Sequence, residues 1–132
     1  MTYMLDTNAI IMAVKHPDWP TCARIIEHLG KDICISAITY GELEYGIQKS
    51  RNPSRNKAAI MQILFGIPIL DFDMKAAEHF GDIFADLESR NARISDRDML
   101  IAAHARSLGY TVVTNNTGEF SRVKDLKITD WK

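Results

Sequence analysis

Short apolar segments alternate with longer amphipathic segments along the whole chain, and this alternation limits the fold more than any other feature of the sequence. Short apolar runs bounded by turn residues are typical of buried strands. Such runs lie at residues 3–5, 33–35, 68–70, 111–114 and 126–129. Strands separated by helices need right-handed crossovers, so the sequence predicts a parallel sheet with helices on both faces. The expected fold class is therefore α/β, with three α/β/α layers.

The segments between these strands carry helical periodicity and recognisable helix ends. Ser36 and Ser95 are predicted N-caps, and Gly30 and Gly109 stand where helices should stop. The expected helices end near residue 14, span 21–29, run from Ser36 to about 49, follow Pro53 to about 66, span 74–90, and run from Ser95 to 107.

The chain of 132 residues contains no repeat, low-complexity tract or linker, which predicts one domain spanning residues 1–132. Its longest apolar run, residues 63–70, is interrupted by a glycine and a proline and is too short to cross a bilayer. The N-terminus lacks signal-peptide features, so we expect a cytoplasmic protein without membrane attachment. Cys22 and Cys34 form no disulfide framework and are expected to be small buried residues.

The net charge of −1 argues against nucleic-acid binding by the whole surface. Basic residues are nevertheless concentrated in two short segments. Each segment is either a solvated loop or helix end, or a rim that contacts RNA phosphates. The RNA-binding candidates are Lys49, Arg51 and Arg55 in the first segment, and Arg90, Arg93 and Arg97 in the second.

Three acidic residues occupy positions that suggest a catalytic or metal-binding role. Asp6 directly follows the first predicted strand, and ligands of parallel sheets bind beyond the carboxyl ends of strands. The same rule points to Ser36 and Asn115. The alternative for Asp6 is a simple N-cap. On a helical wheel Glu42 lies between Ile38 and Tyr45 on a broad face of apolar and small residues, whereas Glu44 lies on the polar face.

A carboxylate on an apolar face needs an arginine partner or a metal ion, and both remain open for Glu42. Asp98 begins a nearly continuous apolar helix. Because Ser95 precedes it by three residues, it is either a capping-box residue or a site residue, with Asp96 as a rival. The segment 114–120 follows a strand, and is either a polar turn before a short helix or another contribution to the site.

Acidic residues that converge without histidine or thiolate ligands favour hard cations such as Mg2+ or Mn2+. Such a site in a phosphodiesterase can activate water and stabilise the leaving oxygen. The motifs GxxxxGK[ST], GxGxxG, GxSxG and HExxH are absent, which removes motif support for nucleotide-binding, serine-hydrolase and zinc-protease functions. His104, on an apolar helix, is expected to be a hydrogen-bonded core residue.

Four segments in this order and at these distances resemble the signature segments of PIN-domain nucleases, and more narrowly the VapC-type toxins of bacterial toxin–antitoxin modules. The resemblance covers essentially the whole chain, including the Asp130-Trp131 ending. The four segments are Met4-Leu-Asp-Thr-Asn8, Ser36-x-x-Thr-x-x-Glu-Leu-x-x-Gly46, Asp98-x-x-Ile-Ala-Ala-x-Ala105 and Val113-Thr-Asn-Asn-x-x-Glu-Phe120.

This resemblance implies a PIN-like domain with a parallel five-stranded sheet and an endoribonuclease that depends on Mg2+ or Mn2+. For close relatives it implies cleavage of a transfer RNA in the anticodon stem-loop, and hence inhibition of translation. It also implies a homodimer held inactive by a cognate antitoxin of the VapB type.

Carried over residue by residue, the metal-binding acids are Asp6, Glu42 and Asp98, and the accessory polar residues are Thr7, Asn8 and Thr114. Many family members have aspartate where this chain has Asn116, so the usual fourth acid is missing. Glu119 is the candidate to replace that charge, and the number of metal ions stays open.

Two other functions fit the sequence less well than a nuclease does. A non-catalytic PIN-like binding module would not need acids at all three matching positions. A phosphatase with Asp6 as nucleophile would need a second aspartate two residues later, where this chain has Asn8.

Overall fold

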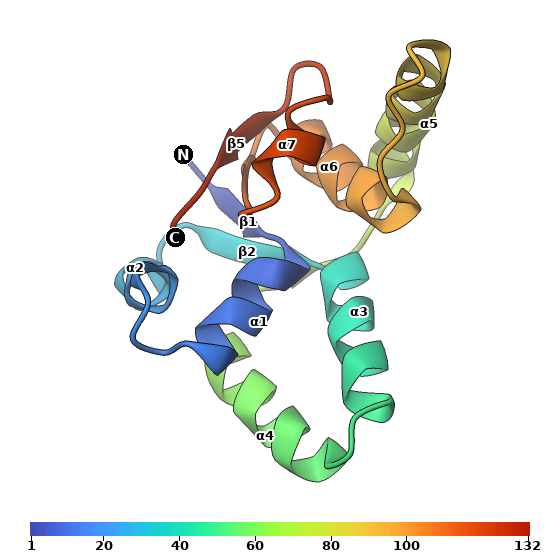
Figure 1. Cartoon of the computed structure of the whole chain (residues 1–132). Coiled ribbons are helices and arrows are strands. Elements are labelled where there is room, and N and C mark those ends of the chain that lie inside the picture. Colours follow the sequence, from blue (N-terminus) through green and yellow to red (C-terminus); the bar gives the residue numbers. More distant parts are fainter.

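The computed structural model describes residues 1–132 and contains one five-stranded parallel sheet with seven helices. The strand order is β3-β2-β1-β4-β5. This confirms the predicted three-layer α/β/α fold (Figure 1). The strands are β1 (Tyr3–Leu5), β2 (Ile33–Ser36), β3 (Ile69–Leu70), β4 (Thr111–Val113) and β5 (Lys127–Thr129). The helices are α1 (Thr7–Lys15), α2 (Pro20–His28), α3 (Ala37–Gln48), α4 (Pro53–Leu64), α5 (Met74–Ser89), α6 (Asp96–Leu108) and α7 (Thr117–Phe120).

Helix ends follow the predicted capping chemistry closely. The Ser36 hydroxyl accepts from the backbone N–H of Ile38 at 3.0 Å and caps α3. The Ser95 hydroxyl likewise accepts from the backbone N–H of Asp98 at 3.2 Å and caps α6. Gly109, with φ of 71°, ends α6 in the left-handed conformation that glycine adopts at least cost.

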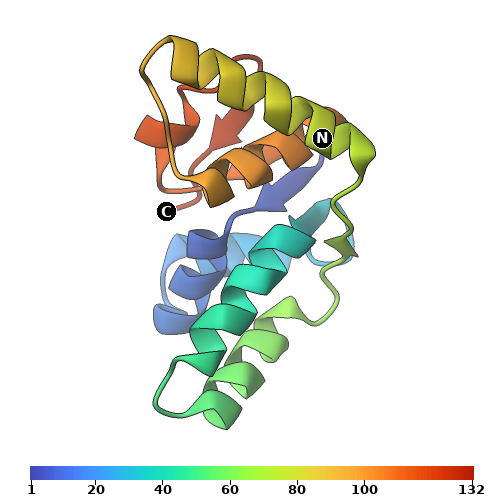
Figure 2. The ribbon, with the colours of Figure 1, turned by 90° about the vertical axis from the view of Figure 1, so that its right-hand side faces the viewer.

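Alternation along the strands divides the core into two halves. Met4 and Val112 point toward α5 and α6, whereas Leu5, Ile35 and Val113 point toward α1, α2 and the end of α4. Figure 2 shows α5 and α6 on one side of the sheet and α1, α3 and α4 on the other. Both cysteines are buried and free, as predicted. Burial of this apolar area is the main stabilising contribution to the fold.

The helices α3 and α4 form a hairpin that extends away from the sheet (Figure 2). Only one side of α3 is fully buried, along Thr39, Leu43 and Ile47. Ile38 and Tyr40 beside this line pack partly against the core, whereas Glu42, Tyr45 and Gly46 line the space beyond the carboxyl ends of the strands.

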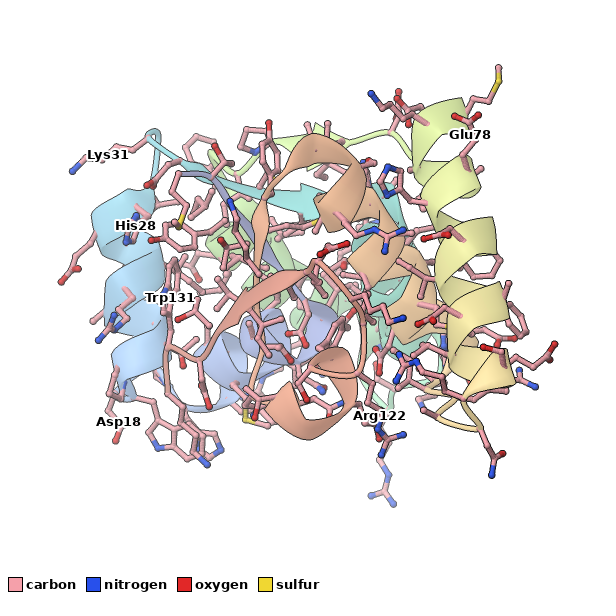
Figure 3. All side chains as sticks on the ribbon, turned by 90° about the horizontal axis from the view of Figure 1, so that it is seen from above. Asp18, His28, Lys31, Glu78, Arg122 and Trp131 are labelled. Carbon is pink, nitrogen blue, oxygen red and sulfur yellow. The ribbon has the colours of Figure 1, made fainter.

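The C-terminal residues pack against α2 and the start of β1. Trp131 is 4% exposed, and its ring centroid lies 5.1 Å from that of Tyr3 and 4.8 Å from that of His28. The labelled side chains in Figure 3 show Trp131 beside His28 on α2. The final residues thus hold α2 against the sheet. None of the helices combines the length and apolar character needed to cross a membrane.

Candidate active site

The direction of the chain through the sheet reverses at the central strand β1. The chain first adds β2 and β3 on one side of β1, and later adds β4 and β5 on the other. The loops after β1 and β4 therefore part from each other and leave a crevice at the carboxyl edge of the sheet, where open α/β sheets bind ligands. Asp6 follows β1 and Thr114 follows β4.

Asp6 combines the two roles that the sequence left open. Its Oδ1 accepts a 2.8 Å hydrogen bond from the backbone N–H of Ala9, so it caps α1, and it is 2% exposed at the crevice. Burial, together with the charges of Asp98 and Glu42, raises the pKa of Asp6 to about 6, against the lowering effect of the hydrogen bonds from Thr114 and Ala9. A buried carboxylate beside two others is stable as an anion only when positive charge is supplied.

Glu42 on α3 has a side chain only 19% exposed. Thr7 Oγ1 donates a 2.6 Å hydrogen bond to one of its carboxylate oxygens, and Arg97 Nε lies 3.4 Å from the other. The arginine partner left open by the sequence is therefore present, and it belongs to α6 on the far side of the crevice. Glu44 is also half-buried, where it pairs with Lys57 at 3.2 Å.

The helical wheel was wrong for Tyr45. It grouped this residue with the apolar face of α3, but Tyr45 is 57% exposed. The cause is that the neighbouring elements bury only the line of Thr39, Leu43 and Ile47 on this helix.

Asp98 lies in the first turn of α6, and its own carboxylate is not the N-cap, because Ser95 fills that position. The pKa of Asp98 is raised by burial and by the charges of Glu119 and Glu42. The hydrogen bond from Ser95 and the charge of Arg97 lower it in part. The rival Asp96 has a side chain 66% exposed and pairs with Arg93 at 3.3 Å. Asp98, and not Asp96, therefore faces the other acids.

Asn116 and Glu119 complete the acidic group from the other side. The Asn116 side-chain amide donates to Asp98 Oδ2 at 3.4 Å and to Glu119 Oε2 at 3.1 Å. Its backbone N–H donates to Thr114 Oγ1 at 2.9 Å. The segment forms the expected polar turn followed by the short helix α7, and it also reaches the site. Where an aspartate would add charge, this asparagine bridges two carboxylates.

Ten residues line an open cleft of about 260 Å³ at this edge, and most of them are polar. They are Asp6, Thr7, Asn8, Ile11, Glu42, Tyr45, Gly46, Lys49, Arg97 and Asp98. No three acidic, histidine or cysteine side chains meet at metal-ligand distance in this arrangement. The donor chemistry still fits a hard divalent cation, because the donors are oxygens and the charges of neighbouring carboxylates raise the pKa of Asp6 and of Asp98.

The six basic candidates differ in their distance from the cleft and in their partners. Lys49 and Arg97 line the cleft itself, and Arg51 and Arg55 are exposed near the turn between α3 and α4. Arg93 instead pairs with Asp96 and lies over the ring of Phe84, with its guanidinium carbon 4.7 Å from the centroid.

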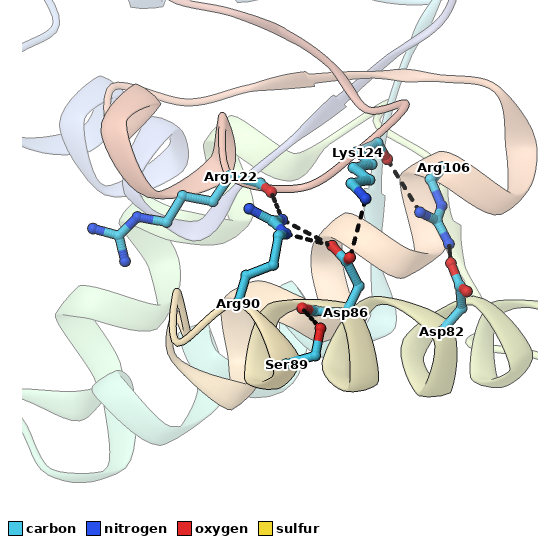
Figure 4. A network of polar contacts seen from close by, with 7 residues as sticks. All are labelled: Asp82, Asp86, Ser89, Arg90, Arg106, Arg122 and Lys124. Carbon is cyan, nitrogen blue, oxygen red and sulfur yellow. Dashed lines mark hydrogen bonds and ion pairs between the residues drawn. The ribbon is translucent and has the colours of Figure 1, made fainter.

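Arg90 is held in a polar network between α5 and the loop that joins α7 to β5 (Figure 4). Its guanidinium donates to Asp86 at 2.8 and 3.1 Å and to the Arg122 carbonyl at 2.7 Å. Lys124 contacts the same Asp86 carboxylate at 3.3 Å. The guanidinium of Arg90 is thus already paired with a carboxylate, whereas Lys49 has no carboxylate partner.

Two residues at strand ends do not join the cleft. Ser36 is fully buried, and its hydroxyl lies 2.7 Å from His104 Nδ1. His104 is 2% exposed, as predicted for a hydrogen-bonded core residue, and burial lowers its pKa. Asn115 lines a separate small cavity beside Trp131. Sequence reasoning missed Tyr45 and Ile11 as lining residues, and no local pattern distinguishes them from core residues.

The raised pKa of Asp6 predicts a pH-dependent stability. An aspartate with a pKa of about 6 in the fold and 3.8 in the unfolded chain stabilises the fold below pH 3.8, and this contribution is lost as pH rises through 6. Metal-stripped protein should therefore gain about 1.4 kcal/mol from this residue between pH 7.5 and pH 5. Urea unfolding of the parent and Asp6→Asn at both pH values isolates the contribution, since His104 titrates in both. Equal pH dependence in the two proteins would contradict it.

Comparison with known proteins agrees with this arrangement. The PIN domain family model matches residues 3–126. The chain is 44% identical over 131 residues to Ribonuclease VapC2 of Haemophilus influenzae, covering 99% of this chain and 98% of that protein. It is 43% identical, with the same coverage, to the tRNA(fMet)-specific endonuclease VapC of Shigella flexneri.

Solved structures give the same result. The DNA-bound VapBC structure of Salmonella typhimurium superposes with a TM-score of 0.94 at 39% identity, covering 100% of this chain and 99% of that chain. The VapBC2 structure of Rickettsia felis, bound to a DNA fragment from their promoter, gives 0.93 at 35% identity with full coverage of both chains. A chain with this sheet, this cleft and these relatives belongs to the PIN domain family and, within it, to the VapC ribonucleases.

Proposed function

We propose that this ribonuclease is the toxin of a toxin–antitoxin module and that it cuts a transfer RNA in its anticodon stem-loop, which inhibits translation in the cytoplasm. The observation that carries the proposal is the acidic cleft at the carboxyl ends of β1 and β4, in a chain 43% identical to a tRNA(fMet)-specific endonuclease. The catalytic residues of this proposal are Asp6, Glu42, Asp98 and Glu119.

In this proposal, Asp6, Glu42 and Asp98 hold Mg2+ or Mn2+. When bound, such a cation lowers the pKa of a water molecule and neutralises charge that develops on phosphate oxygens. Four carboxylates without a thiolate or imidazole among them are the support for these two cations.

The other polar residues orient the acids. Thr7 directs Glu42 through its 2.6 Å hydrogen bond, and Asn116 holds Asp98 and Glu119 at a fixed separation. Thr114 supports both Asp6 and the backbone of Asn116. Asn8 lines the cleft beside them. Such partners fix the carboxylates before substrate arrives, which reduces reorganisation during the reaction.

Lys49 and Arg97 are the proposed phosphate contacts within the cleft, with Arg51, Arg55, Arg90 and Arg93 as outer candidates. The Arg97 side chain is 61% exposed and only 3.4 Å from Glu42. A phosphate entering the cleft therefore meets a guanidinium that is already at the carboxylate group. Because the net charge of the chain is −1, recognition of a folded RNA is favoured over binding of any phosphate chain.

The proposed partner is a cognate antitoxin, because the solved structures of the relatives from Salmonella typhimurium and Rickettsia felis are VapBC assemblies. We further propose that residues 1–132 act as one PIN domain and that the toxin is a homodimer.

Brief induction of the protein in cells, followed by mapping of new RNA 5′ ends, tests the function. We expect new ends at one position in the anticodon stem-loop of one or a few tRNAs. Purified protein freed of antitoxin should make the same cut with Mg2+ or Mn2+ and lose it in excess EDTA, because all candidate ligands are oxygens. Full activity in EDTA would refute the metal requirement, and the absence of any cut would favour the alternative, a PIN-like binding module.

A further inference from the structure

Tyr45 is the only aromatic residue among those that line the acidic cleft. It is 57% exposed and belongs to neither half of the core, although Tyr40 on the same helix packs against one of them. An aromatic ring left in water forgoes the stabilisation that its burial would give. Packing of the fold therefore does not account for a tyrosine at this position.

The position of Tyr45 relates it directly to the acids. It follows Glu42 by three residues on α3, and residues at this spacing are neighbours on a helix surface. Lys49 follows one turn later, with its Nζ 5.0 Å from the ring centroid. The ammonium group lies over one face of the ring, and the tyrosine nevertheless stays 57% exposed.

Along α3, Tyr45 lies between Glu42 of the acidic group and Lys49 at the end of the helix. Lys49 of α3 and Arg97 of α6 are the proposed phosphate contacts, and the carboxylates mark where the phosphodiester is cut. The bases that flank this phosphate belong to the two nucleotides that it joins. Such a base needs an apolar surface when it is not stacked on a neighbouring base. Aromatic side chains supply such a surface for unstacked bases in RNA loops.

We propose that Tyr45 stacks on a nucleobase that flanks the scissile phosphate and so selects unstacked, single-stranded nucleotides at the cut. This inference rests on the proposed endoribonuclease function and adds the base contact to it. Stacking tolerates any base, so Tyr45 fixes the shape of the substrate at this point, and the identity of the RNA is read elsewhere.

The test is a double-mutant cycle between protein and RNA. The substrate is a synthetic stem-loop with the mapped cut, made intact or with an abasic nucleotide on either side of the scissile phosphate. The proteins are the parent, Tyr45→Ala, Tyr45→Phe and the control Phe65→Ala, whose ring is 85% exposed but outside the cleft. Single-turnover cleavage rates at subsaturating enzyme are compared.

For the parent and Tyr45→Phe, we expect one abasic position to slow cleavage roughly tenfold, the size typical of one base–aromatic stack. Tyr45→Ala should cut the intact RNA roughly tenfold more slowly and lose most of its discrimination against the abasic RNA, while Phe65→Ala behaves like the parent. Mn2+-induced thermal stabilisation should be unchanged in Tyr45→Ala, which separates a substrate contact from damage to the acidic group.

Equal discrimination by the parent and Tyr45→Ala would overturn the stacking role while leaving the nuclease intact. If Tyr45→Ala instead cleaves both RNAs like the parent but escapes inhibition by the co-expressed antitoxin, the ring contacts protein and the proposal is wrong. If the parent itself cuts no RNA, the proposed function fails first and the base contact fails with it.

Discussion

Asp6→Asn is expected to reduce RNA cleavage by at least about 1000-fold and, at the same time, to stabilise the metal-free fold. The loss follows from removing the charge of the most buried carboxylate in the cleft. The gain in stability arises from the same charge, because a buried carboxylate is unfavourable in the fold when no cation is bound. A pKa of about 6 in place of 3.8 corresponds to up to about 3 kcal/mol at pH 7.5.

The asparagine keeps a side-chain oxygen that can accept the hydrogen bond from Ala9, so the cap of α1 is preserved. The matched control is Asp73→Asn. Asp73 caps α5 by accepting a 2.9 Å hydrogen bond from the backbone N–H of Ala76, and it lies outside the cleft. This variant should cleave RNA at the parent rate. Cleavage assays and urea unfolding in EDTA at pH 7.5 check both halves. An Asp6→Asn protein that is inactive but also less stable would mean that the residue acts mainly as a structural cap.

Asp98→Asn is expected to raise the melting temperature of the metal-free protein and to abolish most of the further rise that Mn2+ gives the parent. If Asp98 served only as favourable charge at a helix N-terminus, the substitution would instead cost about 0.3–1 kcal/mol. Ser95 already caps α6, and the pKa of Asp98 is raised by burial and by Glu119 and Glu42. Removing this charge therefore relieves repulsion in the metal-free state.

Binding of a cation to the folded state raises stability in proportion to its affinity, so a missing ligand appears as a missing shift. Thermal melts of the parent, Asp98→Asn and Asp96→Asn, in EDTA and in excess Mn2+, make the comparison. Asp96 is exposed and pairs only with Arg93, so Asp96→Asn should keep the full Mn2+ shift. A lower melting temperature of Asp98→Asn in EDTA together with a full Mn2+ shift would show that Asp98 is a helix cap and no metal ligand.

Local physical chemistry in the sequence determined the elements and their order. Strand and helix periods differ, and the caps at Ser36, Ser95 and Gly109 lie where the chain must satisfy the free N–H and C=O groups of helix ends. The positions of Asp6 and Asp98 also followed, because a residue after a central parallel strand and one at a helix start reach the same edge of the sheet.

Only the tertiary structure decided which polar groups meet. A helical wheel orients Glu42 and Tyr45 about the axis of α3, but it does not tell which neighbours cover that axis, so Tyr45 proved exposed. The Ser36 hydroxyl hydrogen-bonds to the buried His104, and Arg97 pairs with Glu42 across the cleft. These partners are separated by 68 and 55 residues, and contacts at such separations depend on how whole elements pack. Burial and the nearness of like charges, which raise the pKa of Asp6, arise only from that packing.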